Sequence, residues 1–203
     1  MDRERLDQQF DFIKEIDKEK FIQRQTRLSD NVRRENDAEH AWHMAIMTVL
    51  LSEYANEKID VLRTVTMLLI HDIVEIDAGD TYAYDEEGLK TQHERECQAA
   101  DRIYALLPED QQSKLRDIWE EFEAGETPEA KFAHTMDNLQ PAMLNVVNNG
   151  VSWKEHGIAI SQIMKRNAHT AEGSQVLWDY AYENFFKKNI DDGNIIDDSK
   201  KMY

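Results

Sequence analysis

The sequence has few of the residues that interrupt helices, with only 7 glycines and 3 prolines among 203 residues. Turns are therefore scarce, which favours long helices over many short strands. The single cysteine, Cys97, has no partner for an intramolecular disulfide and points to a reducing compartment. The longest clean apolar stretch covers only residues 67–70, far less than a membrane span requires.

The sequence also has few positive charges: it contains 24 lysines and arginines and 41 acidic residues, which gives a formal net charge of −17. This balance argues against binding to polymeric nucleic acid or to an anionic membrane, since both require clustered positive charge. The first five residues lack the apolar core of a signal peptide, so we expect an acidic cytoplasmic protein. An apolar fraction of 41% suffices for one compact core, which we place in a single domain at residues 1–190. The acidic tail at 191–203 lacks periodicity, and we expect it to be loose.

Apolar residues recur at helical spacing along most of the chain, and no region alternates convincingly with a period of two. We therefore predict an all-α fold. The helix at about 60–77 is apolar on nearly all faces and should be central. The polar, arginine-rich residues 24–37 read as a loop, and Pro141 should kink or interrupt its helix. The other predicted helices lie at about 3–23, 37–55, 86–107, 109–122, 128–147 and 174–188.

The central helix ends in a run of polar residues, HDIVEIDAGD, at positions 71–80. His71 and Asp72 would be costly to bury without a partner, and a metal ion or a hydrogen-bond network is the usual solution. Glu75 follows His71 by four residues and therefore projects over the same site. An imidazole beside carboxylates suits a divalent cation such as Mn²⁺, Co²⁺, Fe²⁺, Zn²⁺ or Mg²⁺. The alternative is a polar helix end that merely reaches solvent.

Two distant segments favour the metal. Upstream, NVRRENDAEH at 31–40 places His40 at the start of a buried helix. Downstream, AKFAHTMD at 130–137 places Asp137 on an apolar helix face. The order of a histidine, then His-Asp, then a distant aspartate resembles the HD-domain metal-dependent phosphohydrolases. The resemblance implies an HD-domain helical bundle with a central metal-binding helix, and one divalent cation bound by His40, His71, Asp72 and Asp137.

The match is closer to one branch of that family, the 5′-deoxynucleotidase-like nucleoside 5′-monophosphate phosphohydrolases. It covers roughly residues 5–170, on the scale of a domain, and also implies a homodimer. It rests on NVR at 31–33, EN at 35–36, EH at 39–40, HD at 71–72 with Glu75, and GD at 79–80, together with LPED at 107–110, WEEFE at 119–123 and AKF at 130–132.

The resemblance implies hydrolysis of a nucleoside 5′-monophosphate to nucleoside and phosphate. The cation would bind a phosphate oxygen and lower the pKa of a water molecule. Glu75 would orient and deprotonate that water, and Asp80 would protonate the leaving 5′-oxygen. Arg33, within the matched Asn-Val-Arg motif, is the best candidate for holding the phosphate, because a guanidinium binds phosphate oxygens bidentately; Lys131 is a weaker one.

Two other functions are possible. The chain could be an HD phosphohydrolase acting on a triphosphate, a cyclic nucleotide or an alarmone. It could also be a non-catalytic metal-binding regulatory module, although the presence of both Glu75 and Asp80 argues against that. His43, three residues after His40, is an alternative ligand or an outer hydrogen-bond donor, while His134 reads as a polar contact near the site.

One departure concerns the sugar. In the characterised 5′-deoxynucleotidases an arginine–tryptophan pair upstream of the first histidine helps to select deoxyribose. The corresponding stretch here, about Gln25–Thr26, lacks that pair. The sequence therefore predicts weak discrimination between ribose and deoxyribose.

Overall fold

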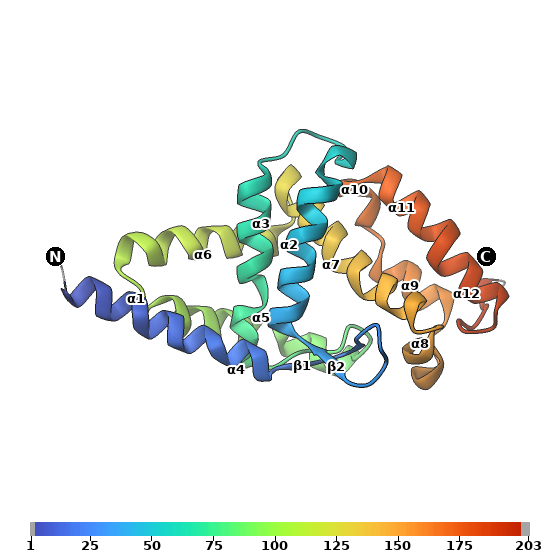
Figure 1. Cartoon of the computed structure of the whole chain (residues 1–203), viewed down its shortest axis with the longest axis horizontal. Coiled ribbons are helices and arrows are strands. Elements are labelled where there is room, and N and C mark those ends of the chain that lie inside the picture. Colours follow the sequence, from blue (N-terminus) through green and yellow to red (C-terminus); the bar gives the residue numbers. More distant parts are fainter. Residues whose placement is uncertain (1–2, 200–203) are drawn as a thin grey trace.

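The computed structural model describes residues 3–199, apart from the side chain of Glu86, and they form a helical protein (Figure 1). The all-α prediction is confirmed. Within these residues, no helix combines the length and apolar character needed to cross a membrane. The helices are α1 (Arg3–Ile16), α2 (Asp37–Leu51), α3 (Val61–Ile70), α4 (Glu75–Ala78), α5 (Glu86–Tyr104), α6 (Glu109–Ala124), α7 (Pro128–Val147), α8 (Val151–His156), α9 (Ile160–Arg166), α10 (Thr170–Gly173), α11 (Gln175–Ala181) and α12 (Lys188–Asp191).

Helices α2, α3 and α7 pack against one another at the centre of the molecule (Figure 1). Met44 of α2, Met67 of α3 and Phe132 of α7 are fully buried between them. The central place predicted for the helix at 60–77 is confirmed. That helix is not uniform, however, because a 3₁₀ turn, η3 (His71–Val74), separates α3 from α4.

Local signals in the sequence fix where the central helices begin. Asn36 caps α2 by accepting a hydrogen bond from the Glu39 backbone N–H, while the Glu39 carboxylate accepts one from Asn36 N–H. Thr127 caps α7, with Pro128 at its first position. Helix α7 continues through Pro141 to Val147, so Pro141 does not interrupt it, and the kink that was the other expected outcome stays a prediction. Buried side chains on both sides of Pro141 hold the helix on the core.

The prediction of a loop at residues 24–37 is also wrong. Strands β1 (Gln23–Arg27) and β2 (Arg34–Asn36) form a two-stranded antiparallel hairpin. Its residues are polar and show no apolar alternation, so the sequence carries no period-two signal. Strand β2 leads directly into α2, which places the hairpin beside the first turn of that helix (Figure 1).

The C-terminal part is more structured than its sequence pattern indicates. The short helices α8, α9 and α10 were not predicted, and α10 packs closely on α7 at Gly173, where a Cβ would clash with the Lys131 carbonyl oxygen. The predicted helix at 174–188 is present as α11, a π-helical stretch η4 (Tyr182–Lys187) and α12. Ile195 is buried and the Ile196 backbone pairs with Ile158 and Ile160, so the expectation of a loose tail is wrong for residues 192–199. Residues 200–203 of that predicted tail lie outside the described residues.

Candidate metal centre

Three separate segments bring the four predicted ligands together. His71 and Asp72 occupy the 3₁₀ turn after α3, His40 lies near the start of α2, and Asp137 lies on α7. All four side chains are buried. A 3₁₀ stretch inside a helix often marks a functional position, and here it presents His71 and Asp72 toward α2 and α7.

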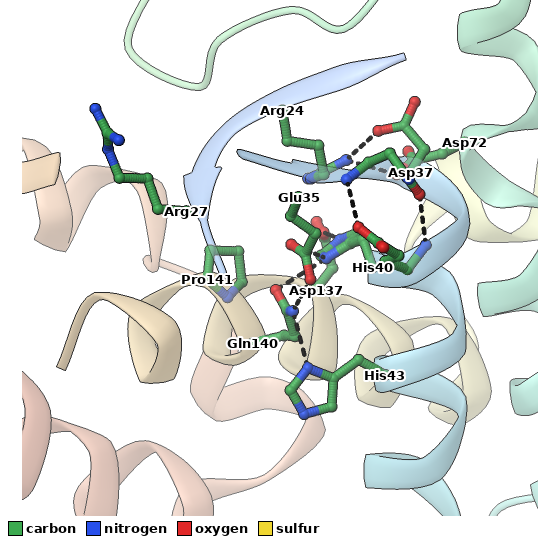
Figure 2. A network of polar contacts seen from close by, with 12 residues as sticks. Arg24, Arg27, Glu35, Asp37, His40, His43, Asp72, Asp137, Gln140 and Pro141 are labelled. Atoms are coloured by element: carbon green, nitrogen blue, oxygen red, sulfur yellow. Dashed lines mark hydrogen bonds and ion pairs between the residues drawn. The ribbon is translucent and has the colours of Figure 1, made fainter. Parts of the chain in front are cut away.

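Hydrogen bonds determine which ring nitrogen of each histidine faces the site. His71 Nδ1 donates to the Leu68 carbonyl oxygen at 2.8 Å, so in the neutral ring, the form that can ligate a metal, Nε2 carries the lone pair. That Nε2 lies 3.0 Å from Asp72 Oδ1 without forming a hydrogen bond. In the same way, His40 Nδ1 lies 2.9 Å from Gln140 Oε1, and its Nε2 lies 3.1 Å from Asp137 Oδ1 (Figure 2).

These contacts fit a bound cation. Each histidine directs a lone pair at a carboxylate oxygen about 3 Å away, and two electron-rich atoms repel at that distance unless a metal ion or a proton lies between them. One donor atom each from His40, His71 and Asp72 lies within 4.8 Å of the others, with Asp137 against His40. Two imidazole nitrogens and two carboxylates are a suitable donor set for a divalent transition metal.

The pKa of His71 shows how strongly the site favours positive charge. Burial alone would lower this pKa, but the carboxylates of Asp72 and Asp137 outweigh burial and raise it to about 9. The pKa of His40 is likewise raised, against burial and Arg24, by Asp137 and Glu35. Without a metal, protons therefore supply the positive charge.

We expect metal binding near neutral pH to release protons, because His71 is protonated below a pKa of about 9 in the metal-free protein and must lose that proton to ligate. Apparent metal affinity should rise with pH up to about 9 and level off above it. Calorimetric titration in two buffers of different ionisation enthalpy measures the proton count. A heat that is independent of the buffer would contradict this assignment.

Two arginines flank the candidate ligands. Arg24 Nη1 lies 2.8 Å from Asp72 Oδ2 and 3.3 Å from Asp37 Oδ1 (Figure 2). Arg166 Nη2, from α9, lies 3.1 Å from Asp137 Oδ2. Sequence reasoning missed both, because Arg24 fell in a supposed loop and α9 was not predicted. Arg24 directly precedes Gln25–Thr26, so this stretch lacks a tryptophan but not an arginine.

Arg33, the predicted phosphate ligand, lies elsewhere. Its guanidinium is half exposed and pairs with Glu39, at 2.8 Å between Arg33 Nη1 and Glu39 Oε2. It is not among the residues that line the cavity beside the candidate ligands. Lys131, the weaker candidate, lies 3.6 Å from Glu172 and is also outside that lining.

A cavity of about 250 Å³ opens beside the ligands, and both predicted catalytic carboxyls, Glu75 and Asp80, line it. Burial, reinforced by the Asp72 and Asp37 carboxylates, raises the pKa of Glu75 well above its usual range. Burial also raises the pKa of Asp80, with Arg24 opposing it. Aromatic side chains also line the cavity, namely Tyr82, Tyr84, Phe122, Trp153 and Phe186.

The remaining histidines have other partners. His43 Nδ1 lies 3.1 Å from Gln140 Nε2, behind His40 (Figure 2). His134 Nε2 donates to the Phe122 carbonyl oxygen at 2.8 Å, which agrees with its interpretation as a polar contact near the site.

The fold and the site together define a class: a helical protein with a buried candidate metal centre of two histidines and two aspartates at one cavity. Within it, the chain belongs to the HD domain family, whose model matches residues 16–178. A predicted metal-dependent phosphohydrolase from Magnetospirillum magnetotacticum MS-1, known from its crystal structure, is 46% identical, with a TM-score of 0.90 over 95% of this chain and 96% of that one.

Curated relatives agree with the resemblance seen in the sequence. Human 5′-deoxynucleotidase HDDC2 is 31% identical over 130 residues, which cover 64% of this chain and 62% of the human protein. The 5′-deoxynucleotidase hdd1 of Schizosaccharomyces pombe is 27% identical over 110 residues, or 52% of this chain and 54% of that protein. The chain thus matches between half and two thirds of the length of these relatives. The predicted resemblance to 5′-deoxynucleotidase-like HD proteins is confirmed.

Proposed function

We propose that the protein is a metal-dependent phosphohydrolase that converts nucleoside 5′-monophosphates to nucleosides and phosphate. One observation carries the proposal: Glu75 and Asp80, a candidate base and a candidate acid, line the same cavity as His71, Asp72 and Asp137. The names of the relatives, 5′-deoxynucleotidase and metal-dependent phosphohydrolase, support the same reaction. A metal-binding regulatory module would have no need of this pair of carboxyls.

His40, His71, Asp72 and Asp137 would hold the cation, which when bound supplies a Lewis acid and lowers the pKa of water. Glu75 takes a proton from the attacking water. As the bond from phosphorus to the 5′-oxygen breaks, Asp80 gives its proton to the leaving oxygen.

Phosphate binding is assigned to the arginines of the cavity. Arg24 contacts Asp72 Oδ2, and Arg166 contacts Asp137 Oδ2. When a cation binds these two carboxylates, the guanidinium groups beside them can bind phosphate oxygens. The exposed Arg33 holds Glu39 in the cap of α2 instead, next to His40 in the sequence. We therefore propose that Arg33 contributes through that cap, although the sequence had indicated direct contact with the phosphate.

The pKa values suit the two proposed roles. Burial raises the pKa of Asp80, which favours the protonated form that a general acid needs. The pKa of Glu75 is raised well above its usual range in the metal-free protein, which makes it a stronger base. A cation beside Glu75 lowers that pKa, so the carboxylate forms when the metal binds.

Phosphate release from a panel of nucleotides, with Mn²⁺ or Co²⁺ added, tests the proposal. Turnover of monophosphates alone supports it. Release of pyrophosphate or tripolyphosphate would instead assign the cavity to a longer nucleotide. Tight metal binding without turnover of any nucleotide would contradict an enzymatic function.

We expect weak discrimination between ribose and deoxyribose. Arg24 is followed by Gln25 and Thr26, and all three line the cavity, so β1 offers no aromatic ring to pack against the sugar. The ratio of kcat/KM for dAMP and AMP measures this preference. A strong preference for dAMP would show that another residue selects the sugar.

We also propose a homodimer in the cytoplasm. The outer face of α2 supports the dimer, because Trp42, Ile46, Val49 and Leu50 are exposed there at helical spacing and a second copy would cover them. Light scattering on the full chain should give twice the monomer mass of 23.8 kDa; the monomer mass would exclude the dimer.

A further inference from the structure

A buried polar network of Glu35, His43 and Gln140 lies beside His40 (Figure 2), and none of these three residues lines the cavity. Gln140 is fully buried and contacts three side chains: its Oε1 lies 2.9 Å from His40 Nδ1, and its Nε2 lies 2.6 Å from Glu35 Oε1 and 3.1 Å from His43 Nδ1. Asp137 and Gln140 are three residues apart on α7 and so share a face. The two side chains hold the two ring nitrogens of His40 between them.

The direction of each hydrogen bond follows from the chemistry of the groups. Glu35 Oε1 is a carboxylate acceptor, so the atom 2.6 Å away must be the amide nitrogen of Gln140. The amide oxygen therefore faces His40, and an oxygen can only accept. His40 must then carry a proton on Nδ1, so the neutral ring has its lone pair on Nε2, the atom beside Asp137. Reversing the amide would set two oxygens against each other at that short distance.

The burial of the Glu35 carboxylate needs a physical reason. Its side chain is 1% exposed, and its Oε2 has no hydrogen-bond partner among the described residues; the nearby His40 Nδ1 lies 3.6 Å from it. Burying a carboxylate is costly unless it is paired and hydrogen-bonded, and both groups that Glu35 approaches, Gln140 and His40, belong to this network. Glu35 sits on β2, directly before the residue that caps α2, so hairpin and helix both fix its position.

We propose that Glu35 and Gln140 are positioning residues that fix the tautomer and orientation of His40 for metal binding. Glu35 fixes the amide of Gln140, and Gln140 fixes the ring of His40. Partners of this kind hold a ligand in place and raise its basicity. The inference rests on the metal centre of the proposed function but not on any particular substrate.

The test uses the full chain and two readouts that do not depend on turnover. The first is the Kd for Co²⁺, measured by competition with a chelator. The second is the nitrogen-15 spectrum of the His40 ring in protein loaded with Zn²⁺, where a protonated Nδ1 gives its own signal. Glu35→Gln keeps the shape of the side chain, but removes the charge and allows the amide of Gln140 to reverse.

Glu35→Gln should weaken Co²⁺ binding by about tenfold or more, the scale found for lost outer partners of metal ligands, and should weaken or shift the His40 Nδ1–H signal. His43→Ala is the matched control, because it removes only the other acceptor of Gln140; its Co²⁺ affinity should stay near that of the unchanged protein. Thermal unfolding of the metal-free variants should show that each folds, since Glu35→Gln keeps the volume of the side chain and removes a buried charge.

If Glu35→Gln does not fold, Gln140→Met gives the same test, because it keeps the volume but leaves His40 Nδ1–H without its acceptor. A folded variant of either kind with unchanged Co²⁺ affinity and an unchanged His40 signal would overturn the proposal. Failure of the proposed function is distinguishable, because it would appear as intact metal binding and positioning without phosphate release.

Discussion

His71→Ala is expected to yield a protein that retains no divalent cation and releases no phosphate. His71 directs its Nε2 into the site, 3.0 Å from Asp72 Oδ1, and its Nδ1 donates to the Leu68 carbonyl oxygen. Alanine removes one of the four proposed metal-donor side chains and also removes the imidazole that lies beside the Asp72 carboxylate. Elemental analysis after dialysis against trace metal, combined with a phosphate assay, checks both outcomes.

His134→Ala is the matched control for this variant. His134 is also a histidine of the cavity wall, but its Nε2 is bonded to the Phe122 carbonyl oxygen. We expect His134→Ala to retain its metal. If His71→Ala loses the metal and His134→Ala keeps it, His71 is identified as a metal ligand. Circular dichroism must show that both variants fold. Full metal occupancy in folded His71→Ala would show that the ligand assignment is wrong.

Glu75→Gln is expected to separate catalysis from metal binding. Glu75 is not among the four proposed ligands, yet its Oε2 is buried in the cavity wall without a hydrogen-bond partner among the described residues. The amide keeps the shape of the side chain and removes the base. Metal content and fold should change little, while kcat falls by about 10²-fold or more, the usual scale for a general base.

Glu123→Gln provides the comparison for Glu75. Glu123 lines the same cavity, and burial, reinforced by Glu96, raises its pKa to about 7, but the proposed mechanism does not use it. Its variant should keep most of its turnover. Substrate binding should survive in Glu75→Gln, because Arg24 and the cation hold the phosphate. A folded, metal-loaded Glu75 variant with near-normal kcat would remove Glu75 from the mechanism.

The long helices could be predicted because burial imposes a period that the sequence displays. Helix α3 shows it most clearly, since Met67, Leu68 and Ile70 are all buried. The β1–β2 hairpin could not be predicted in this way, because its stability comes from backbone pairing and from ion pairs of Arg24 with Asp37 and Asp72. The short helices α8 and α10 pack on α7, and α9 reaches it through the ion pair of Arg166 with Asp137; a local sequence pattern does not reveal such contacts.

The residues of the candidate site could likewise be predicted only in part. His40, His71, Asp72 and Asp137 could be proposed because their order matches a family, and the structure places them together. Arg24 and Arg166 could not, since each enters the cavity from an element that the sequence pattern did not reveal. Arg33 had the stronger motif, yet its guanidinium is satisfied by Glu39, six residues further along the chain.

The most direct test of the central claim is phosphate release from a nucleoside 5′-monophosphate by chelator-treated protein during titration with Co²⁺ or Mn²⁺. The account predicts no release before metal is added and a rise that reaches a plateau at one cation per chain, with Glu75→Gln binding the same cation and releasing little phosphate. Release that is unaffected by the chelator, or full metal binding without any release, would contradict it.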